Sequence, residues 1–410
     1  MKKQLVIYFL IILFLGITTT IVVLYGRGYR FIQDGEGIEV AGTGLLAATS
    51  IPEGAGIYVN GHLTSATNTT VNLRPGEYDV RIVKEGYFPW EKKITIQKEV
   101  VSIASALLFS TTPKLENITD SGVSNPVIDP SGTQIAFTVA SQSARRNGVY
   151  ILDMSSRPVL TLQSSSTQIS DDTSDIFSQS LLSWSPDGKE LIATISASTK
   201  VGLPATYIVS AERFNQIPQD VTQTIDAVNL TWQKQKEDKE RSQMLGLKAK
   251  LRSLISENFK IISWSPNEAK ILYLASESAT LPLVIDPPLI GTNTTAENRS
   301  IEKDGIYVYD IKEDKNFQIN INPSGIQPKD LQNPSQSPPL TWFPDSKHLI
   351  FVEDRKINIM EYDGTNKTVV YAGPFMDNYV FPWPDGSKLV ILTNLGNENI
   401  TPNLYTIGLK

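Results

Sequence analysis

A turn motif built around proline recurs five times between residues 128 and 386, and it constrains the fold more than any other feature. Each copy is followed by a polar or basic residue and then by a short apolar run typical of a buried β-strand. Because proline fixes one backbone angle and Asp-Gly pairs suit tight turns, each copy predicts a β-turn between two strands. The copies are Ile128-Asp129-Pro130-Ser131-Gly132, Trp184-Ser185-Pro186-Asp187-Gly188, Trp264-Ser265-Pro266-Asn267-Glu268, Trp342-Phe343-Pro344-Asp345-Ser346 and Trp383-Pro384-Asp385-Gly386.

The spacing of these turns indicates the size of the repeating unit. Between successive prolines the steps are 56, 80, 78 and 40 residues, and the shortest is close to one four-stranded propeller blade. The motif resembles the TolB-like and WD40-like repeats, which implies a β-propeller over residues 111–410. We expect five blades, with a sixth, degenerate blade around Ala227–Trp232 as the alternative. Residues 114–119 are expected to pair with Asn403–Leu409 and to complete the last blade.

The longer steps between motifs contain insertions, which the alternation of strand direction places at one end of the blades. These insertions are Gln163–Ser180, Gln223–Phe259, Ser276–Asp304 and Asn322–Pro339. The second is expected to hold a helix over about residues 233–256, with an apolar stripe at helical spacing formed by Met244, Leu247, Leu251 and Leu254. We interpret this stripe as packing on the propeller itself. A basic amphipathic helix that binds a membrane or an acidic partner is the alternative.

The N-terminal run Leu5–Tyr25 contains no charged residue. As a helix it would span about 31 Å, close to the hydrocarbon thickness of a bilayer. The run is longer than the apolar region of a signal peptide and lacks an Ala-x-Ala pattern, so we interpret it as an uncleaved anchor. Residues 1–4 are then a cytoplasmic tail and residues 26–42 a linker. The domains that follow favour an extracytoplasmic C-terminal part.

Residues 43–110 contain six short strand-like runs separated by turn signals, which predicts a small β-sandwich. Ile51-Pro52-Glu53-Gly54-Ala55 is followed by Ile57-Tyr58-Val59-Asn60-Gly61, and then by Leu73-Arg74-Pro75-Gly76-Glu77-Tyr78 and Lys84-Glu85-Gly86-Tyr87. In signature, order and spacing these segments resemble the PEGA domain. The resemblance implies an extracytoplasmic β-domain of envelope proteins without catalytic activity. We expect the Gly and Pro residues of the motif to shape turns.

The residue inventory leaves few means of catalysis. The chain has no Cys, and its two His, His62 and His348, fall in different predicted domains. Thiolate nucleophiles, Cys-based metal sites, a two-His metal site and a Ser-His-Asp triad are therefore poorly supported. The aspartates of the repeated motif have an ordinary turn role, and Trp184, Trp264 and Trp342 are expected to pack in or between blades. We predict no catalytic residue, no metal and no cofactor, and we assign no binding residue.

The whole chain is therefore expected to be all-β with one N-terminal transmembrane helix, a PEGA-type sandwich and a propeller. The net charge of −6 is small for 410 residues and gives no reason to expect a nucleic acid partner. The favoured function is a membrane-anchored binding or scaffold protein of the cell envelope, with a protein or glycan partner. The alternative is an envelope hydrolase with a site built from Asp and Glu on the propeller face that carries the insertions.

Overall fold

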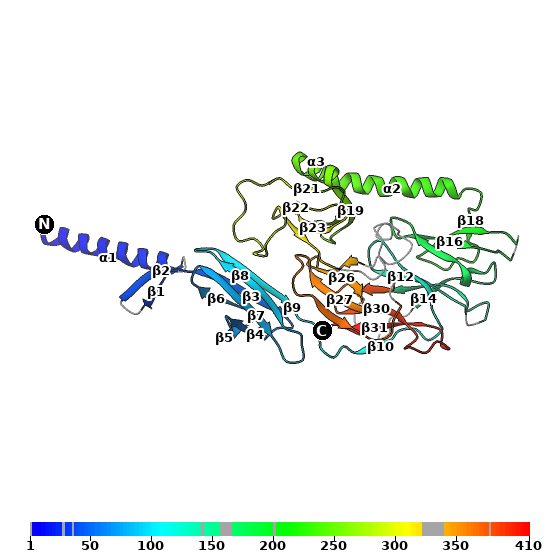
Figure 1. The fold of residues 1–410 in the computed structure, drawn as a ribbon, viewed down its shortest axis with the longest axis horizontal. Coiled ribbons are helices and arrows are strands. Elements are labelled where there is room, and N and C mark those ends of the chain that lie inside the picture. Colours follow the sequence, from blue (N-terminus) through cyan, green and yellow to red (C-terminus); the bar gives the residue numbers. More distant parts are fainter. Residues whose placement is uncertain are drawn as a thin grey trace. The chain divides into compact units, whose positions relative to one another are not determined.

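The computed structural model divides the chain into two units, which Figure 1 colours along the sequence. The N-terminal unit comprises Met1–Phe109 together with Ile285–Ala296. The C-terminal unit comprises Ser110–Val284 together with Glu297–Lys410. The structure describes residues 2–26, 29–34, 37–140, 143–155, 166–199, 202–321, 340–376 and 379–410.

The N-terminal unit begins with helix α1 (Lys2–Gly26), most of whose apolar side chains are exposed. Among the described helices, α1 is the one long and apolar enough to cross a membrane, a property that signal sequences share. The predicted linker of residues 26–42 instead contains a hairpin of β1 (Tyr29–Asp34) and β2 (Gly37–Gly42). In β2, Ile38 and Val40 alternate with other residue types, which is the pattern of a strand.

Two sheets form the remainder of the N-terminal unit and pack into a sandwich. One sheet has the order β6-β3-β9 and the other β5-β4-β7-β8. Alternate residues of the strands are buried between the sheets, including Leu46, Ile57, Ile82 and Ala104. The strands are β3 (Gly44–Ile51), β4 (Gly56–Val59), β5 (His62–Ala66), β6 (Thr69–Leu73), β7 (Gly76–Val83), β8 (Trp90–Ile96) and β9 (Val101–Leu107).

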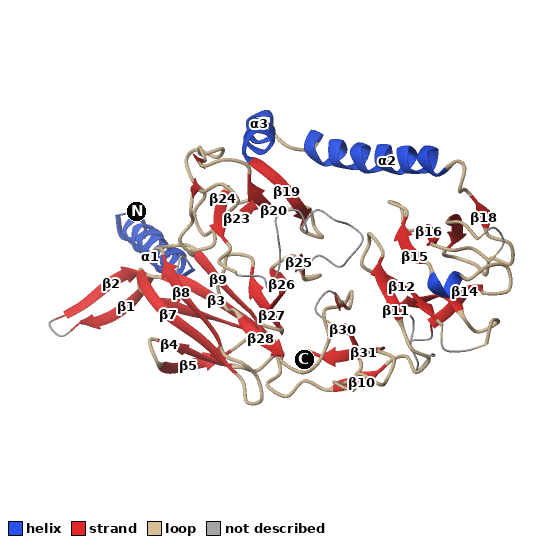
Figure 2. Cartoon of the chain, turned by 45° about the vertical axis from the view of Figure 1, so that its right-hand side comes forward, coloured by secondary structure: helices blue, strands red, loops and turns tan. Residues whose placement is uncertain are grey.

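Among its described residues, the C-terminal unit contains five four-stranded antiparallel sheets that resemble propeller blades, here called the first to fifth sheets (Figure 2). The first is β11 (Ser124–Ile128), β12 (Gln134–Val139), β13 (Gly148–Asp153) and β14 (Ser166–Asp171). The second is β15 (Leu181–Trp184), β16 (Glu190–Ile195), β17 (Ala205–Ser210) and β18 (Gln219–Asp220). The third is β19 (Phe259–Trp264), β20 (Lys270–Ala275), β23 (Ile306–Asp310) and β24 (Lys315–Gln318).

The fourth and fifth sheets differ in how the chain supplies their outer strand. The fourth is β25 (Leu340–Trp342), β26 (His348–Glu353), β27 (Lys356–Glu361) and β28 (Thr368–Tyr371), in chain order. The fifth is β29 (Val380–Pro382), β30 (Lys388–Thr393) and β31 (Asn403–Gly408), completed by β10 (Leu115–Asn117). Leu115 pairs with Ile407 and Asn117 with Tyr405, so the predicted pairing of residues 114–119 with the last strand is confirmed.

The five proline motifs are the turns between the first two strands of the sheets, as predicted. In every copy the backbone N–H of the residue before proline donates to the carbonyl five residues later, at 2.8 or 2.9 Å. The turn ends on a residue with φ between 54° and 72°, a conformation that favours glycine. These residues are Gly132, Gly188, Glu268, Ser346 and Gly386.

Shared apolar cores establish the order in which the sheets pack. One core joins the first and second sheets, another the first and fifth, and a third the third and fourth. The fourth and fifth sheets meet where Gly386 lies against the ring of Phe343. Trp184 and Trp342 are buried in two of these cores, which agrees with a packing role. The series of sheets is therefore second, first, fifth, fourth, third.

Two helices connect the ends of this series. Helix α2 (Ile225–Leu245) follows the second sheet, and α3 (Ala249–Asn258) leads into the third. The prediction of one helix over about 233–256 is therefore corrected to two, because the chain turns at Gly246. The alternative of a sixth blade around Ala227–Trp232 is wrong, because Ile225, Val228 and Trp232 follow helical spacing and this segment lies within α2.

The other predicted insertions have different outcomes. Gln163–Ser180 contains the outer strand β14 and a short helix, η1 (Phe177–Gln179), so it is not a strandless loop. Ser276–Asp304 does lie between the second and third strands of the third sheet, and it holds the short strands β21 (Ala279–Thr280) and β22 (Ser300–Ile301). The predicted insertion Asn322–Pro339 lies outside the described residues.

Two alanine substitutions separate backbone strain from packing in the repeated turns. Gly132 (φ +72°) and Gly386 (φ +65°) share a conformation, but a Cβ on Gly132 meets no atom within 4 Å, whereas one on Gly386 lies 2.8 Å from the Phe343 ring. We expect Gly132→Ala to cost about 1–2 kcal/mol of unfolding free energy. Gly386→Ala should lower the unfolding free energy by about 1–3 kcal/mol more than Gly132→Ala, because the ring of Phe343 must shift to make room for the new methyl group.

The measurement is denaturant unfolding of both variants and the parent chain, followed by near-ultraviolet circular dichroism. Equal losses in the two variants would contradict the close approach of the fourth and fifth sheets.

Candidate functional site

The two histidines are held apart and in different settings. His62 lies in β5 of the N-terminal unit and is exposed. His348 is buried in the C-terminal unit, with Nδ1 2.6 Å from the Asp345 carboxylate. Burial raises the pKa of Asp345, but the hydrogen bond and charge of His348 outweigh it, so the net pKa is lowered. Within the described part of the chain, no group of three or more His, Asp and Glu side chains is arranged to hold a metal ion.

The aspartates of the repeated motif hold their own turns. Asp129 accepts hydrogen bonds from the backbone N–H groups of Thr133 and Gln134 at 2.7 and 2.6 Å. In the second sheet Ser185 occupies the position of Asp129, and its Oγ accepts the equivalent hydrogen bond from the Glu190 N–H at 3.0 Å. These contacts are those of turn residues, as the sequence predicts.

Asp175, in the connection between the first and second sheets, is a buried carboxylate with 1% of its surface exposed. It accepts hydrogen bonds from the hydroxyls of Ser198, Thr199 and Tyr207 and from two backbone N–H groups. Burial raises the pKa of Asp175, but these bonds, chiefly from Ser198 and Tyr207, outweigh it and hold the pKa well below its usual range. Burial and the same carboxylate raise the pKa of Tyr207 to about 12. These hydrogen bonds join the connection that contains Asp175 to Ser198, Thr199 and Tyr207 of the second sheet and its loop.

Asp175→Asn is expected to lower the unfolding free energy at neutral pH by about 1–3 kcal/mol, because charge-assisted hydrogen bonds are lost. Since the folded-state pKa of Asp175 lies below the unfolded value of about 3.9, its contribution is present above that pH and is lost as the pH falls below it. The measurement is unfolding between pH 7 and about pH 2. A parent chain and variant that lose stability in parallel with acid would refute this role.

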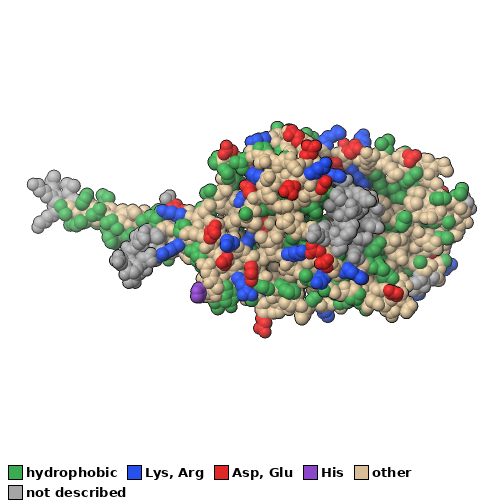
Figure 3. Space-filling view, viewed as in Figure 1, with side chains coloured by type: hydrophobic (Ala, Val, Ile, Leu, Met, Phe, Trp, Pro, Cys, Tyr) green, Lys and Arg blue, Asp and Glu red, His purple; other side chains and the backbone are tan. Residues whose placement is uncertain are grey.

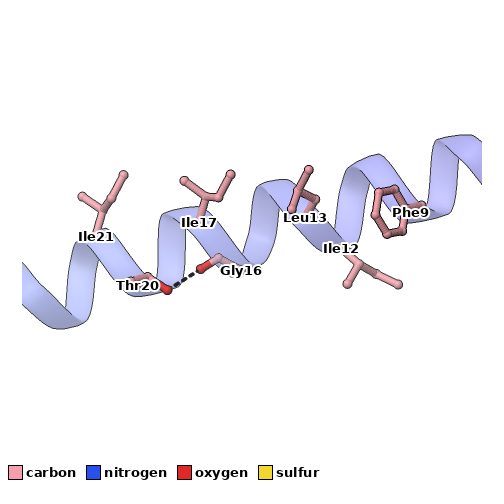
Figure 4. A pocket seen from close by; sticks show the side chains of 7 residues that line it. All are labelled: Phe9, Ile12, Leu13, Gly16, Ile17, Thr20 and Ile21. Atoms are coloured by element: carbon pink, nitrogen blue, oxygen red, sulfur yellow. Dashed lines mark hydrogen bonds between the residues drawn. The ribbon is translucent and has the colours of Figure 1, made fainter.

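One hollow among the described residues lies along α1 and is bounded by that helix alone. Figure 4 shows its side chains, among them Phe9, Leu13 and Ile17, projecting from successive turns. Thr20 Oγ1 donates to the Gly16 carbonyl at 2.8 Å, as hydroxyls do within apolar helices. With no second wall, this hollow encloses no ligand.

A second hollow, of about 310 Å³, lies between α2 and the second sheet, and we call it the α2 pocket. Its apolar wall is made by Ile192 of β16 and by Ile225 and Trp232 of α2. Ile192 and Trp232 are 7% and 9% exposed. The other lining residues are polar, and they are Ser183, Thr194, Asn229, Gln233 and Lys236.

The α2 pocket exists because only one face of the second sheet packs on another sheet. Leu182, Trp184 and Ala193 are buried against the first sheet. The opposite face presents Ser183, with the neighbouring Leu181 61% exposed. In a series of blades, this second face would meet the next sheet. Helix α2 takes that place but covers the face incompletely.

Helix α3 covers the corresponding face of the third sheet. Leu251, Leu254 and Ile255 are buried with Phe259 and Tyr273, so the predicted packing of the helical stripe on its own domain is confirmed for this helix. Between its ends α2 is solvated, and all side chains from Gln233 to Ser242 are exposed. Its C-terminal end is tied to the third sheet by a 2.8 Å hydrogen bond from Gln243 to Glu268.

The signature segment of the N-terminal sandwich is a braced turn. Gly54 has φ +74°, and Ala55 is fully buried beside it. Thr67 Oγ1 accepts from the Ala55 N–H at 3.0 Å and lies 2.7 Å from Ser50 Oγ. Residues 43–108 match the family described as "PEGA domain". This part of the chain is a PEGA domain. Its signature residues shape the turn, as expected.

Comparison of the whole chain gives more distant similarities. It is similar to the structure named "putative TolB from Agrobacterium tumefaciens" at 14% identity and a TM-score of 0.22, covering 68% of this chain and 76% of that one. It is also similar to the structure of TolB from Acinetobacter baumannii, at 14% identity and a TM-score of 0.23. This match covers 81% of this chain and 59% of that one. A third similar structure is named a "putative gluconolactonase". The identity is 11% and the TM-score 0.27, and the match covers 74% of this chain and 94% of that one. No curated protein matched the chain.

The α2 pocket was not predicted from the sequence. Its strand residues, Ser183, Ile192 and Thr194, lie beside the repeated motif but carry no motif of their own. The available signal was the helical spacing of Ile225, Val228 and Trp232, which extends the helix toward the second sheet.

Proposed function

We propose that this chain is a single-pass, membrane-anchored binding or scaffold protein of the cell envelope. In this proposal α1 is an uncleaved anchor, and the PEGA domain and the sheets of the C-terminal unit lie outside the cytoplasm. The five sheets act as one five-bladed propeller, closed by the pairing of β10 with β31. The propeller contacts a protein or glycan through its insertions and has no catalytic role.

The observation that carries this proposal is the combination of the exposed apolar helix α1 with a PEGA domain in one chain. An apolar helix whose side chains are largely exposed is stable in a lipid environment. The solvated stretch of α2 gives the C-terminal unit a polar projecting surface, and loops and insertions on a rigid scaffold are usual places for binding. On the face of the C-terminal unit seen in Figure 3, acidic and basic side chains intermingle, which agrees with a partner other than nucleic acid.

The proposal can be tested in cells because the chain has no Cys, so that one introduced thiol is the only reactive site. Lys239→Cys places a thiol on the solvated part of α2, and Lys189→Cys places one on the short turn of the second sheet. A membrane-impermeant maleimide with a photoreactive group is added to cells whose outer layers are permeable. We expect both thiols to be labelled and only Lys239→Cys to form a photo-crosslink to an envelope protein or glycan.

Each contrary result bears on a different part of the proposal. If neither thiol is labelled until the membrane is dissolved, the proposed topology is wrong. If both are labelled and neither forms a crosslink, the solvated part of α2 is not the binding surface.

A further inference from the structure

We propose that the α2 pocket binds a hydroxylated ligand that carries one carboxylate, of the class of acidic sugars. This inference rests on the proposed extracytoplasmic function, where such sugars occur as parts of glycans. It assigns to the C-terminal unit a specific site formed by α2 and the inner strands of the second sheet.

The size of the pocket is the first argument. Its volume of about 310 Å³ lies at the lower end of the range of small-molecule sites. Ile192 and Trp232 form a buried apolar wall between the strands and the helix. A pocket of this size, with an apolar wall and a polar rim, suits a ligand of one or two sugar rings.

The hydrogen-bonding chemistry of the rim is the second argument. Ser183 and Thr194 contribute hydroxyls from the sheet, and Asn229 and Gln233 contribute amides from the helix. Hydroxyls and amides both donate and accept hydrogen bonds, as sugar hydroxyls do. Among the described residues, the side chains of Ser183, Thr194 and Asn229 form no hydrogen bond, so they are available to a ligand. Gln233 donates to Glu237 on the same helix at 2.9 Å, and this exposed contact can be exchanged.

The charge of the pocket is the third argument. Lys236 is the one charged side chain among the lining residues, and no carboxylate lines the pocket with it. Within the described part of the chain its ammonium group forms no ion pair. A lone ammonium beside neutral hydrogen-bonding groups selects a ligand with one negative charge, since charge-assisted hydrogen bonds are the stronger ones.

The experiment uses two probes that differ only in the acidic group, methyl glucuronide and methyl glucoside. Each is titrated into the full chain in detergent micelles, and the heat of binding is measured by calorimetry. We expect the glucuronide to bind at least about tenfold more tightly than the glucoside, because a charge-assisted hydrogen bond to a carboxylate is stronger than one to a neutral hydroxyl. Lys236→Gln should abolish this preference.

Lys239→Gln is the matched control, since it makes the same change of charge one turn along the same helix, at a residue that does not line the pocket. It should keep the preference for the glucuronide. The proposal is overturned if the parent chain binds neither probe, if it binds both equally, or if Lys239→Gln loses the preference as fully as Lys236→Gln. A glucuronide preference without a cellular crosslink would leave this site standing and refute the contact of the solvated part of α2 with an envelope partner. A cellular crosslink without a glucuronide preference would refute the sugar site alone and leave the proposed function standing.

Discussion

The pairing of β10 with β31 is the interaction on which the C-terminal unit depends. It joins Leu115–Asn117, at the start of the unit, to the last strand of the chain, and no other described strand completes the fifth sheet. The pairing is extended at both ends, because the Gly408 N–H donates to the Lys114 carbonyl and the Ile118 N–H donates to the Leu404 carbonyl, each at 2.9 Å. The core between the first and fifth sheets relies on it, since Leu404 is buried there. Without this pairing the edge of β31 would be left open.

The way in which the sheets pack on one another also explains where the proposed binding site lies. Four junctions in the series of sheets are made by sheet-on-sheet contacts, whereas the second and third sheets are joined by α2 and α3. A helix cannot cover a sheet face as evenly as another sheet does, because its side chains project from a narrow cylinder. The uncovered part of the second sheet becomes the α2 pocket. In this account the helical insertion replaces sheet packing and forms the pocket proposed as a ligand site at the same place.

The fold could be predicted from the sequence where local chemistry decides it. Proline is shared by all five turns and Asp-Gly by two of them, and the single strand at the start of the unit together with the three-stranded last repeat implies the closing pair. Three features could not be predicted in this way. β14 is rich in Ser, Thr and Gln and is defined by its pairing with β13 rather than by an apolar pattern. The start of α2 contains β-branched residues such as Val228 and Thr231, which suit a strand equally well. The α2 pocket depends on a sheet face that α2 covers incompletely, and this is decided by distant parts of the chain.

The closing pair can be measured directly because the chain contains no Cys. Asn117 and Tyr405 are register partners in β10 and β31 and lie midway between the hydrogen-bonded partners. In such pairs the Cα atoms are about 4.5 Å apart, within the range that a disulfide can bridge. Asn117→Cys combined with Tyr405→Cys should therefore oxidise to one intramolecular disulfide in the folded protein, detected as a loss of free thiol by mass spectrometry. Thiols that stay free in the folded chain, or that bridge only after unfolding, would contradict the closure of the fifth sheet by β10.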